Sequence, residues 1–128
     1  MKKIQPKTML MLGASLVFFG IILGAFGAHG LKSILDETKM NTFKTGVDYQ
    51  LYHGFGLLIL GIVSLLRSEM NLNASAKFML SGVVLFSINC YLYALSGMKF
   101  FALIVPFGGV SFIIAWGLFF LSLKNSRE

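Results

Sequence analysis

The chain has few charged side chains. Only 12% of its 128 residues are Asp, Glu, Lys or Arg, against about 25% in an ordinary soluble protein. By contrast, 56% of the residues are hydrophobic. This composition excludes a soluble globular domain and indicates an integral membrane protein.

Charged residues are absent from four long stretches of the sequence. These charge-free stretches are residues 9–28, 49–66, 78–98 and 100–123. In helical geometry, about 20 apolar residues cross a hydrocarbon core of about 30 Å. We therefore predict an all-α integral membrane protein, a bundle of four transmembrane helices that forms a single domain over residues 1–128. Its predicted spans are residues 9–28, 43–66, 78–98 and 100–123.

Cysteine is almost absent, since Cys90 is the only one in the sequence. A single thiol can form neither an internal disulfide nor a cysteine metal cluster. The sequence also contains no serine nucleophile motif, no phosphate-binding glycine loop, no CxxC pair and no HExxH run. We predict no enzymatic activity, no bound metal and no cofactor.

Acidic residues are scarce as well: five Asp and Glu stand against eleven Lys and Arg, which gives a net charge of +6. Such a charge can indicate nucleic-acid binding, but in a chain this apolar the cations are better explained as flanks of the spans. With four spans, seven of the cations, Arg127 among them, lie on the side of the two termini and four on the other side. Because Lys and Arg favour the cytoplasmic side, we predict that both termini are cytoplasmic. The predicted partner is the lipid bilayer, with no nucleic acid.

The first span is rich in small residues. Gly20, Gly24 and Ala28 recur every fourth residue, with Gly27 beside them, and small residues let a second helix approach closely. We predict helix packing on this face and self-association as a homo-oligomer. The small residues also fit a signal-peptide cleavage site, but the apolar run is longer than a signal segment and three more spans follow, so a retained helix is expected.

The second span is preceded by a segment with helical periodicity. Either Asp36 or Thr38 can cap a helix here. An apolar stripe at spacings of three and four contains Met40, Phe43, Val47 and Leu51. This pattern predicts one long helix over residues 37–66, with its first part at the outer interface and its second part inside the bilayer.

A group of polar residues is expected near the outer face of the bundle. This predicted polar cluster consists of His29, Asp48, Tyr49, Gln50, Tyr52, His53 and Asn89. Two imidazoles and a carboxylate are a known ligand set for zinc or iron, but His29 and His53 do not share one helix at a fixed spacing. The alternative, which we favour, is that Asp48 accepts a hydrogen bond from a tyrosine hydroxyl or from His29 and ties the first loop to the second helix.

The third span carries a polar stripe with helical spacing. Its members are Gly82, Asn89, Tyr93 and Ser96. Polar side chains in a bilayer avoid lipid, so this stripe should face protein. We expect Asn89 to join two helices through an interhelical hydrogen bond.

The third and fourth spans are separated by residues 97–99 only, which predicts a tight hairpin. In the fourth span, Pro106 removes one backbone donor and predicts a kink. Gly108 and Gly109 follow directly and predict close helix packing beside it.

Three ordered blocks of the sequence resemble a known family. They are residues 24–29, residues 45–53 (TGVDYQLYH) and residues 106–112 (PFGGVSF), the last followed by Trp116. The chain resembles the YgdD/YwdK family of small bacterial inner-membrane proteins, the domain-of-unknown-function 423 family. This resemblance implies a four-helix protein of the bacterial inner, or plasma, membrane with no established activity. One block departs from the family pattern: Ile88 stands where the family has a glycine between two serines, so a close contact at Ile88 is not expected.

These observations favour a non-enzymatic membrane protein that binds a small ligand, a lipid or a partner at the polar cluster. The alternative is an oligomeric channel or transporter for an ion or small solute that uses Asp48, His53 and Asn89. A metal-dependent membrane enzyme is the third possibility.

Overall fold

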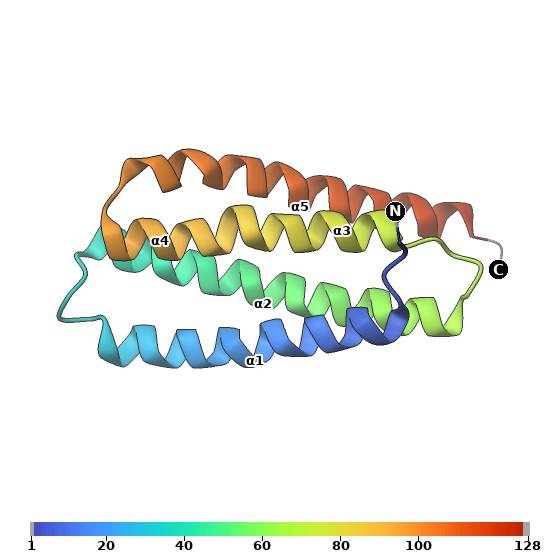
Figure 1. The fold of residues 1–128 in the computed structure, drawn as a ribbon, viewed down its shortest axis with the longest axis horizontal. Helices are drawn as coiled ribbons and strands as arrows, with labels where there is room; N and C mark the ends of the chain where they lie inside the picture. Colours follow the sequence, from blue (N-terminus) through green and yellow to red (C-terminus); the bar gives the residue numbers. More distant parts are fainter. Residues whose placement is uncertain (1, 127–128) are drawn as a thin grey trace.

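The computed structural model describes residues 2–126, so Arg127, one of the cations counted above, lies outside the described residues. The described chain is helical: α1 (Pro6–Gly30), α2 (Glu37–Leu66), α3 (Asn73–Val83), the π-helix η1 (Val84–Ile88), α4 (Asn89–Ser96) and α5 (Lys99–Asn125). Because α3, η1 and α4 follow one another without a break, they form one rod, and four helical rods pack together (Figure 1). Each rod is long and apolar enough to cross a membrane. The predicted all-α fold with four spans is confirmed.

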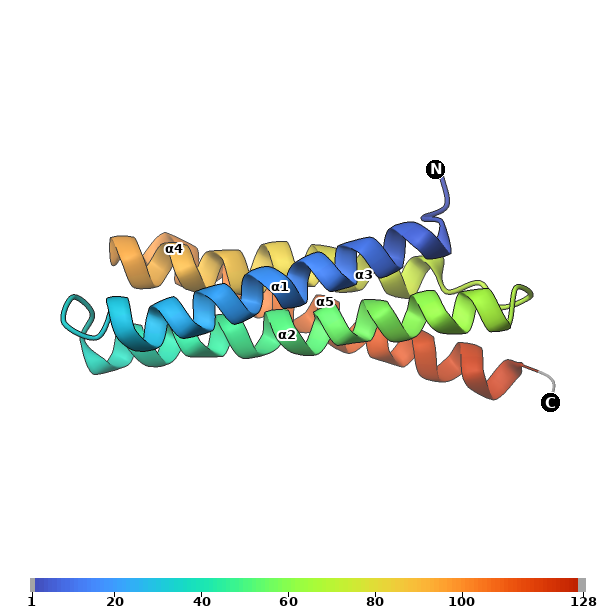
Figure 2. The ribbon, with the colours of Figure 1, turned by 90° about the horizontal axis from the view of Figure 1, so that it is seen from below.

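The two ends of the bundle carry different connections. Figure 1 shows the two termini and the α2–α3 loop at one end, and the α1–α2 loop and the α4–α5 turn at the other end. Figure 2, seen at right angles to this view, shows α1 lying along α2. The four spans therefore divide the charged segments between the two ends in the way that the charge count assumes.

Glycines bring α1 and α2 together. Gly13, Gly20 and Gly27 are buried at seven-residue intervals on one face of α1. A Cβ added to Gly13 would lie 2.7 Å from the carbonyl oxygen of Gly54, and one added to Gly27 would lie 2.5 Å from the ring of Phe43. Small residues are needed here because the backbone of α1 lies close to the backbone of α2 at Gly13 and close to the side chain of Phe43 at Gly27.

The glycine contact between α1 and α2 also affects the prediction of self-association. Gly20 and Gly24 also face α2 of their own chain, against Leu51 and Val47, whereas Ala28 is exposed. The small-residue face is thus occupied within one chain. The predicted homo-oligomer stays a prediction, and it requires a different surface.

The N-terminus of α2 is fixed by a side-chain cap. Asp36 Oδ1 accepts a hydrogen bond from the backbone N–H of Lys39 at 2.8 Å, which satisfies one donor that the helix leaves open. Of the two predicted caps, Asp36 is the one used. From there α2 continues to Leu66, so the long predicted helix is confirmed.

The π-helix η1 changes the face that α4 turns toward the bundle. A π-turn holds about one residue more than an α-turn. The buried position within η1 is Ser87, and the buried positions after it are Asn89, Cys90 and Ala94. The predicted polar stripe is wrong at its end, because Tyr93 is only half-buried and Ser96 is exposed. The extra residue in η1 rotates both of them away from the core.

The side chain of Asn89 forms hydrogen bonds with η1 and not with a neighbouring helix. Its side-chain N–H₂ donates to the carbonyl oxygens of Val84 and Leu85, at 3.0 and 3.1 Å. The expected interhelical bond is therefore wrong: the amide bonds to backbone carbonyls of the π-turn that precedes it. Ile88 is 42% exposed, which fits a position that no helix approaches closely.

The hairpin between the last two spans is as tight as predicted. Gly97 adopts φ +71°, a left-handed conformation that glycine tolerates without strain, and α5 begins two residues later. The helix α5 continues through Pro106 to Asn125. Gly108 lies directly against η1, where an added Cβ would be 2.5 Å from the backbone nitrogen of Phe86.

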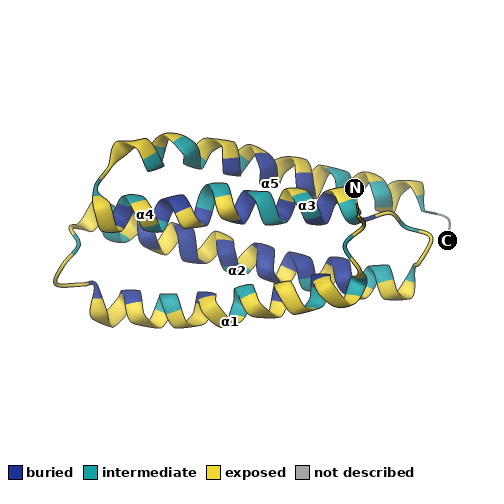
Figure 3. Cartoon of the chain, in the orientation of Figure 1, coloured by how far each residue is buried: buried dark blue, intermediate teal, exposed yellow. Residues whose placement is uncertain are grey.

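The outer surface of the bundle is apolar. Figure 3 shows the buried residues along the facing sides of the rods and exposed residues on their outer sides. Among the exposed side chains are Phe18, Phe26, Leu103 and Ile113, each at least 59% exposed. Such a surface suits contact with lipid chains.

Candidate functional site: an aromatic groove between α2 and α5

The predicted polar cluster divides into buried and exposed groups around α2. Gln50 is buried and joins three helices: its amide nitrogen donates to the carbonyl oxygen of Leu16 at 2.9 Å, and its amide oxygen accepts from the hydroxyl of Tyr91 at 2.8 Å. Both ends of the amide are satisfied, so this side chain ties α1, α2 and α4 together.

His53 is also buried, and it packs against α5. Its Nδ1 lies 2.7 Å from the carbonyl oxygen of Tyr49, and its Nε2 lies 3.1 Å from Nε1 of Trp116. Because the indole N–H can only donate, Nε2 must accept, and a neutral ring with its proton on Nδ1 makes both bonds. The imidazole stacks on the ring of Phe112 with centroids 3.4 Å apart. Its position is thus held by α2 and α5 together.

The stack continues into an aromatic groove. The ring of Tyr49 stacks on Phe86 of η1, with centroids 4.5 Å apart, and lies 5.9 Å from Phe112. The groove has a volume of about 550 Å³. We call it the aromatic groove, and its lining residues are Tyr49, Tyr52, His53, Phe86, Gly109, Phe112, Ile113 and Trp116.

The aromatic groove opens on the outer side of the bundle, halfway along α2 and α5. Tyr52 is 57% exposed and Ile113 is 73% exposed, so the open side faces the region that lipid occupies around a membrane bundle. The hydroxyls of Tyr49 and Tyr52 make no hydrogen bond to any residue between 2 and 126. Two hydroxyl groups in a largely apolar groove are therefore free to bind a molecule from outside the chain.

Asp48 and His29 do not join this site. Both side chains are exposed, and within the described part of the chain neither forms a hydrogen bond or an ion pair. The expected bond from a tyrosine or from His29 to Asp48 is therefore wrong, because Asp48 lies on the outward face of α2. Among residues 2–126, no three His, Cys, Asp or Glu side chains come close enough to hold a metal ion.

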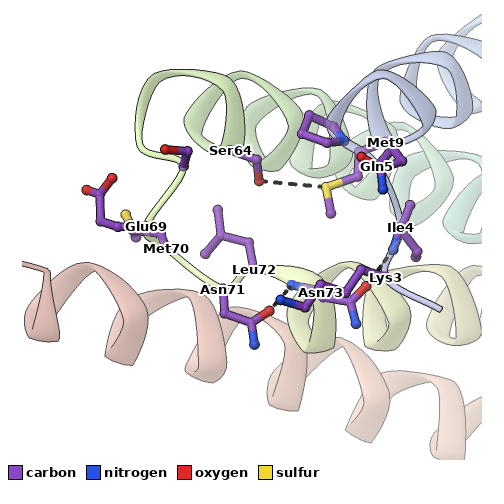
Figure 4. Close-up of a pocket in the computed structure, with 12 residues that line it drawn as sticks. Lys3, Ile4, Gln5, Met9, Ser64, Glu69, Met70, Asn71, Leu72 and Asn73 are labelled. Carbon is purple, nitrogen blue, oxygen red and sulfur yellow. Dashed lines mark hydrogen bonds between the residues drawn. The ribbon is translucent and has the colours of Figure 1, made fainter. Parts of the chain in front are cut away.

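A second hollow lies at the end of the bundle that carries the termini (Figure 4). It has a volume of about 240 Å³ and is lined by the N-terminal segment, the end of α2 and the α2–α3 loop. There the side-chain oxygen of Asn73 accepts from the backbone N–H of Ile4 at 2.8 Å. This bond fastens the N-terminal segment to α3.

Sequence reasoning missed the α5 half of the aromatic groove. Gly109, Phe112, Ile113 and Trp116 follow one another at spacings of three, one and three, so they share one face of a helix. On α2, Tyr49, Tyr52 and His53 show the same spacing. The helical spacing could therefore have identified each face separately. The sequence alone does not reveal that these faces of α2 and α5 meet.

Comparisons with known proteins agree with this architecture. The model of the family described as "Protein of unknown function (DUF423)" matches residues 23–109. The chain is 38% identical over 116 residues to a UPF0382 membrane protein of Staphylococcus haemolyticus, covering 91% of this chain and 94% of the other. It is 34% identical over 111 residues to the UPF0382 membrane protein YwdK of Bacillus subtilis, covering 86% and 90%. It is 37% identical over 110 residues to the inner membrane protein YgdD of Escherichia coli K12, covering 86% and 84%. No solved structure matches the chain.

Proposed function

Because this chain belongs to the DUF423 family and is similar to proteins named membrane and inner membrane proteins, we propose a function that takes place within the bilayer. The protein is a non-enzymatic membrane protein that binds one phospholipid, with an acyl chain in the aromatic groove. The observation that carries this proposal is the outward-facing groove of about 550 Å³ whose two tyrosine hydroxyls have no partner within residues 2–126.

The shape and lining of the aromatic groove support a lipid occupant. Its volume falls within the range of about 300–1,000 Å³ typical of ligand sites, and such sites combine apolar walls with a few polar groups. Side chains on a helix lean toward its N-terminal end, which in α2 is the end near Lys44. The hydroxyls of Tyr49 and Tyr52 are therefore directed toward the level of the lipid ester groups, and the rings below them contact the chain.

The channel alternative receives less support from the geometry. A conduction path needs polar side chains that are free to face a solute. The amide groups of Gln50 and Asn89, however, form hydrogen bonds within the chain. His53 is likewise bonded at both ring nitrogens. These groups hold the bundle together.

Lipid binding can be measured through Trp116, the only tryptophan. A phospholipid with a brominated acyl chain quenches tryptophan fluorescence on contact. We expect quenching in detergent to saturate at low lipid concentration, because one chain enters the groove beside Trp116. Gly109→Leu should abolish the saturable part. An added Cβ at Gly109 finds its nearest neighbour, the ring of Phe86, at 3.9 Å, so the backbone has room for a side chain there. Because Gly109 lines the groove, we expect the leucine to fill it, and an unchanged thermal midpoint checks that the fold is kept.

The matched control is Gly117→Leu on the same helix. A Cβ at Gly117 would meet nothing within 4 Å, and this residue does not line the groove. It should therefore keep the saturable quenching. Quenching that rises in simple proportion to lipid in all three proteins would reject the proposal, since that is the behaviour of lipid in contact with any exposed tryptophan.

The orientation in the membrane forms part of the same proposal: both termini face the cytoplasm. The excess of Lys and Arg on the side of the termini supports it. In a Cys90→Ala background, a cysteine in place of Lys39 should react with an impermeant thiol reagent added to intact cells. A cysteine in place of Lys124 should react only after permeabilisation. The reverse labelling pattern would show that both termini lie outside the cytoplasm.

A further inference from the structure

A small notch lies between α1 and α2, on the stretch of α2 that precedes the residues of the aromatic groove. It has a volume of about 230 Å³, and its lining consists of Gly24, Gly27, Phe43, Lys44, Val47 and Asp48. Gly24 and Gly27 form its α1 side, packed against Val47 and Phe43 of α2. We call it the charged notch, because Lys44 and Asp48 stand at its edge.

Lys44 and Asp48 are one helical turn apart, about 6 Å along the axis, and both are exposed. Two opposite charges at this spacing often form an ion pair. Within residues 2–126, however, neither side chain takes part in an ion pair or a hydrogen bond. One positive and one negative group are thus presented side by side and unpaired on the exposed face of α2, within its N-terminal half.

From this arrangement we infer that the charged notch binds the headgroup of phosphatidylethanolamine. The phosphate of this lipid is negative and binds Lys44, while its ammonium group is positive and donates hydrogen bonds to the carboxylate of Asp48. The ethanolamine linker is short, so the phosphate and the ammonium group of the lipid lie close together. Lys44 and Asp48 are likewise close, because they are one helical turn apart. Charge complementarity therefore selects a zwitterionic aminophospholipid over an anionic lipid, which Asp48 repels.

The position of the notch connects it with the aromatic groove. Tyr52 lies one turn below Asp48 on α2, about 6 Å deeper along the axis, and it lines the groove. A lipid with its headgroup at Lys44 and Asp48 can pass the hydroxyl of Tyr52 and place one chain beside Trp116. This inference rests on the proposed function and names the lipid class that the site prefers.

The test compares phospholipids that carry identical brominated chains and differ only in the headgroup. Saturable quenching of Trp116 is titrated with phosphatidylethanolamine, phosphatidylcholine and phosphatidylglycerol. We expect phosphatidylethanolamine to bind about tenfold more tightly than phosphatidylcholine, because the quaternary ammonium of choline has no N–H to donate and charge-assisted hydrogen bonds are among the strong ones. Asp48→Asn should remove this tenfold preference, and Lys44→Gln should weaken the binding of both lipids alike.

Two control variants change exposed charges at the same end of the bundle but outside the notch. Glu37→Gln should keep the preference for ethanolamine, and Lys99→Gln should bind all three lipids as the original chain does. Equal binding of the ethanolamine and choline lipids by the original chain would overturn the inference. If the quenching were still saturable in that case, the proposal that a lipid binds in the aromatic groove would stand. A preference for phosphatidylglycerol, or a change of oligomeric state in Asp48→Asn, would also overturn it, in favour of an anionic lipid or a second copy of the chain.

Discussion

We expect Gly108→Ala to lower the free energy of unfolding by about 3 kcal/mol, at the upper end of the cost of overpacking a core. The added Cβ would lie 2.5 Å from the backbone nitrogen of Phe86 and 2.8 Å from the carbonyl carbon of Leu85. Those atoms belong to η1, so no side-chain rotation relieves the clash. Either α5 or the third rod must move as a whole.

Unfolding of Gly108→Ala is measured by titration with a denaturing detergent in mixed micelles, with the helix content as the signal. Gly117→Ala is the matched control in the same helix, because an added Cβ there meets nothing within 4 Å, and it should show no loss. Gly109→Ala should behave like the control, since its nearest contact is 3.9 Å away. An equal loss in all three variants would mean that helix flexibility, and not the contact with η1, explains the effect.

His53→Ala should cost about 3 kcal/mol, whereas Asp48→Asn should change the stability by less than about 0.5 kcal/mol. Truncation of His53 leaves a hole beside Phe112 and removes the acceptor of the Trp116 indole N–H. Asp48 is exposed and forms no hydrogen bond within residues 2–126, so replacing its carboxylate with an amide breaks nothing in the fold. The thermal midpoint in detergent of the two variants and the original chain gives the comparison.

Phe55→Ala controls for the removal of a large side chain from the same helix. Phe55 is 52% exposed and faces outward, so this variant should melt close to the original chain. If His53→Ala were as stable as Phe55→Ala, the imidazole would not be a structural element. A large loss in Asp48→Asn would show that the carboxylate has a partner that this single chain does not supply.

The elements that could be predicted from sequence are those set by local chemistry. The length of an apolar run determines whether a helix can cross a bilayer, and Asp36 before a helical stripe determines where α2 begins. Gly97 is the residue that the tight hairpin requires, since the chain must turn within two residues there. The spans, the start of α2 and the hairpin each depend on a short stretch of sequence. The spans depend also on the thickness of the apolar bilayer core.

The π-helix η1 could not be predicted in this way. It depends on contacts between distant residues: Gly108 of α5 lies against its backbone, and Asn89 bonds two of its carbonyl oxygens. Nothing in the local pattern of the third span separates a π-turn from an α-turn. As a result, helical periodicity placed Ser96 on the wrong face.

The candidate site was predicted in part. Residues 48–53 were expected to act together, but a helix distributes six consecutive residues around its whole circumference. Gln50 therefore faces α1 and α4, His53 faces α5, and Asp48 faces outward. The groove itself arises where the aromatic faces of α2 and α5 meet, and a contact between residues about 60 positions apart is not encoded in local spacing.

The most direct test of the central claim is a count of the lipid molecules that stay on the protein. Native mass spectrometry from mild detergent, with phosphatidylethanolamine added, gives this count for the original chain, Gly109→Leu and Gly117→Leu. The aromatic groove predicts one retained lipid on the original chain and on Gly117→Leu, and none on Gly109→Leu. The same lipid count on all three proteins would contradict the assignment of the groove as the binding site.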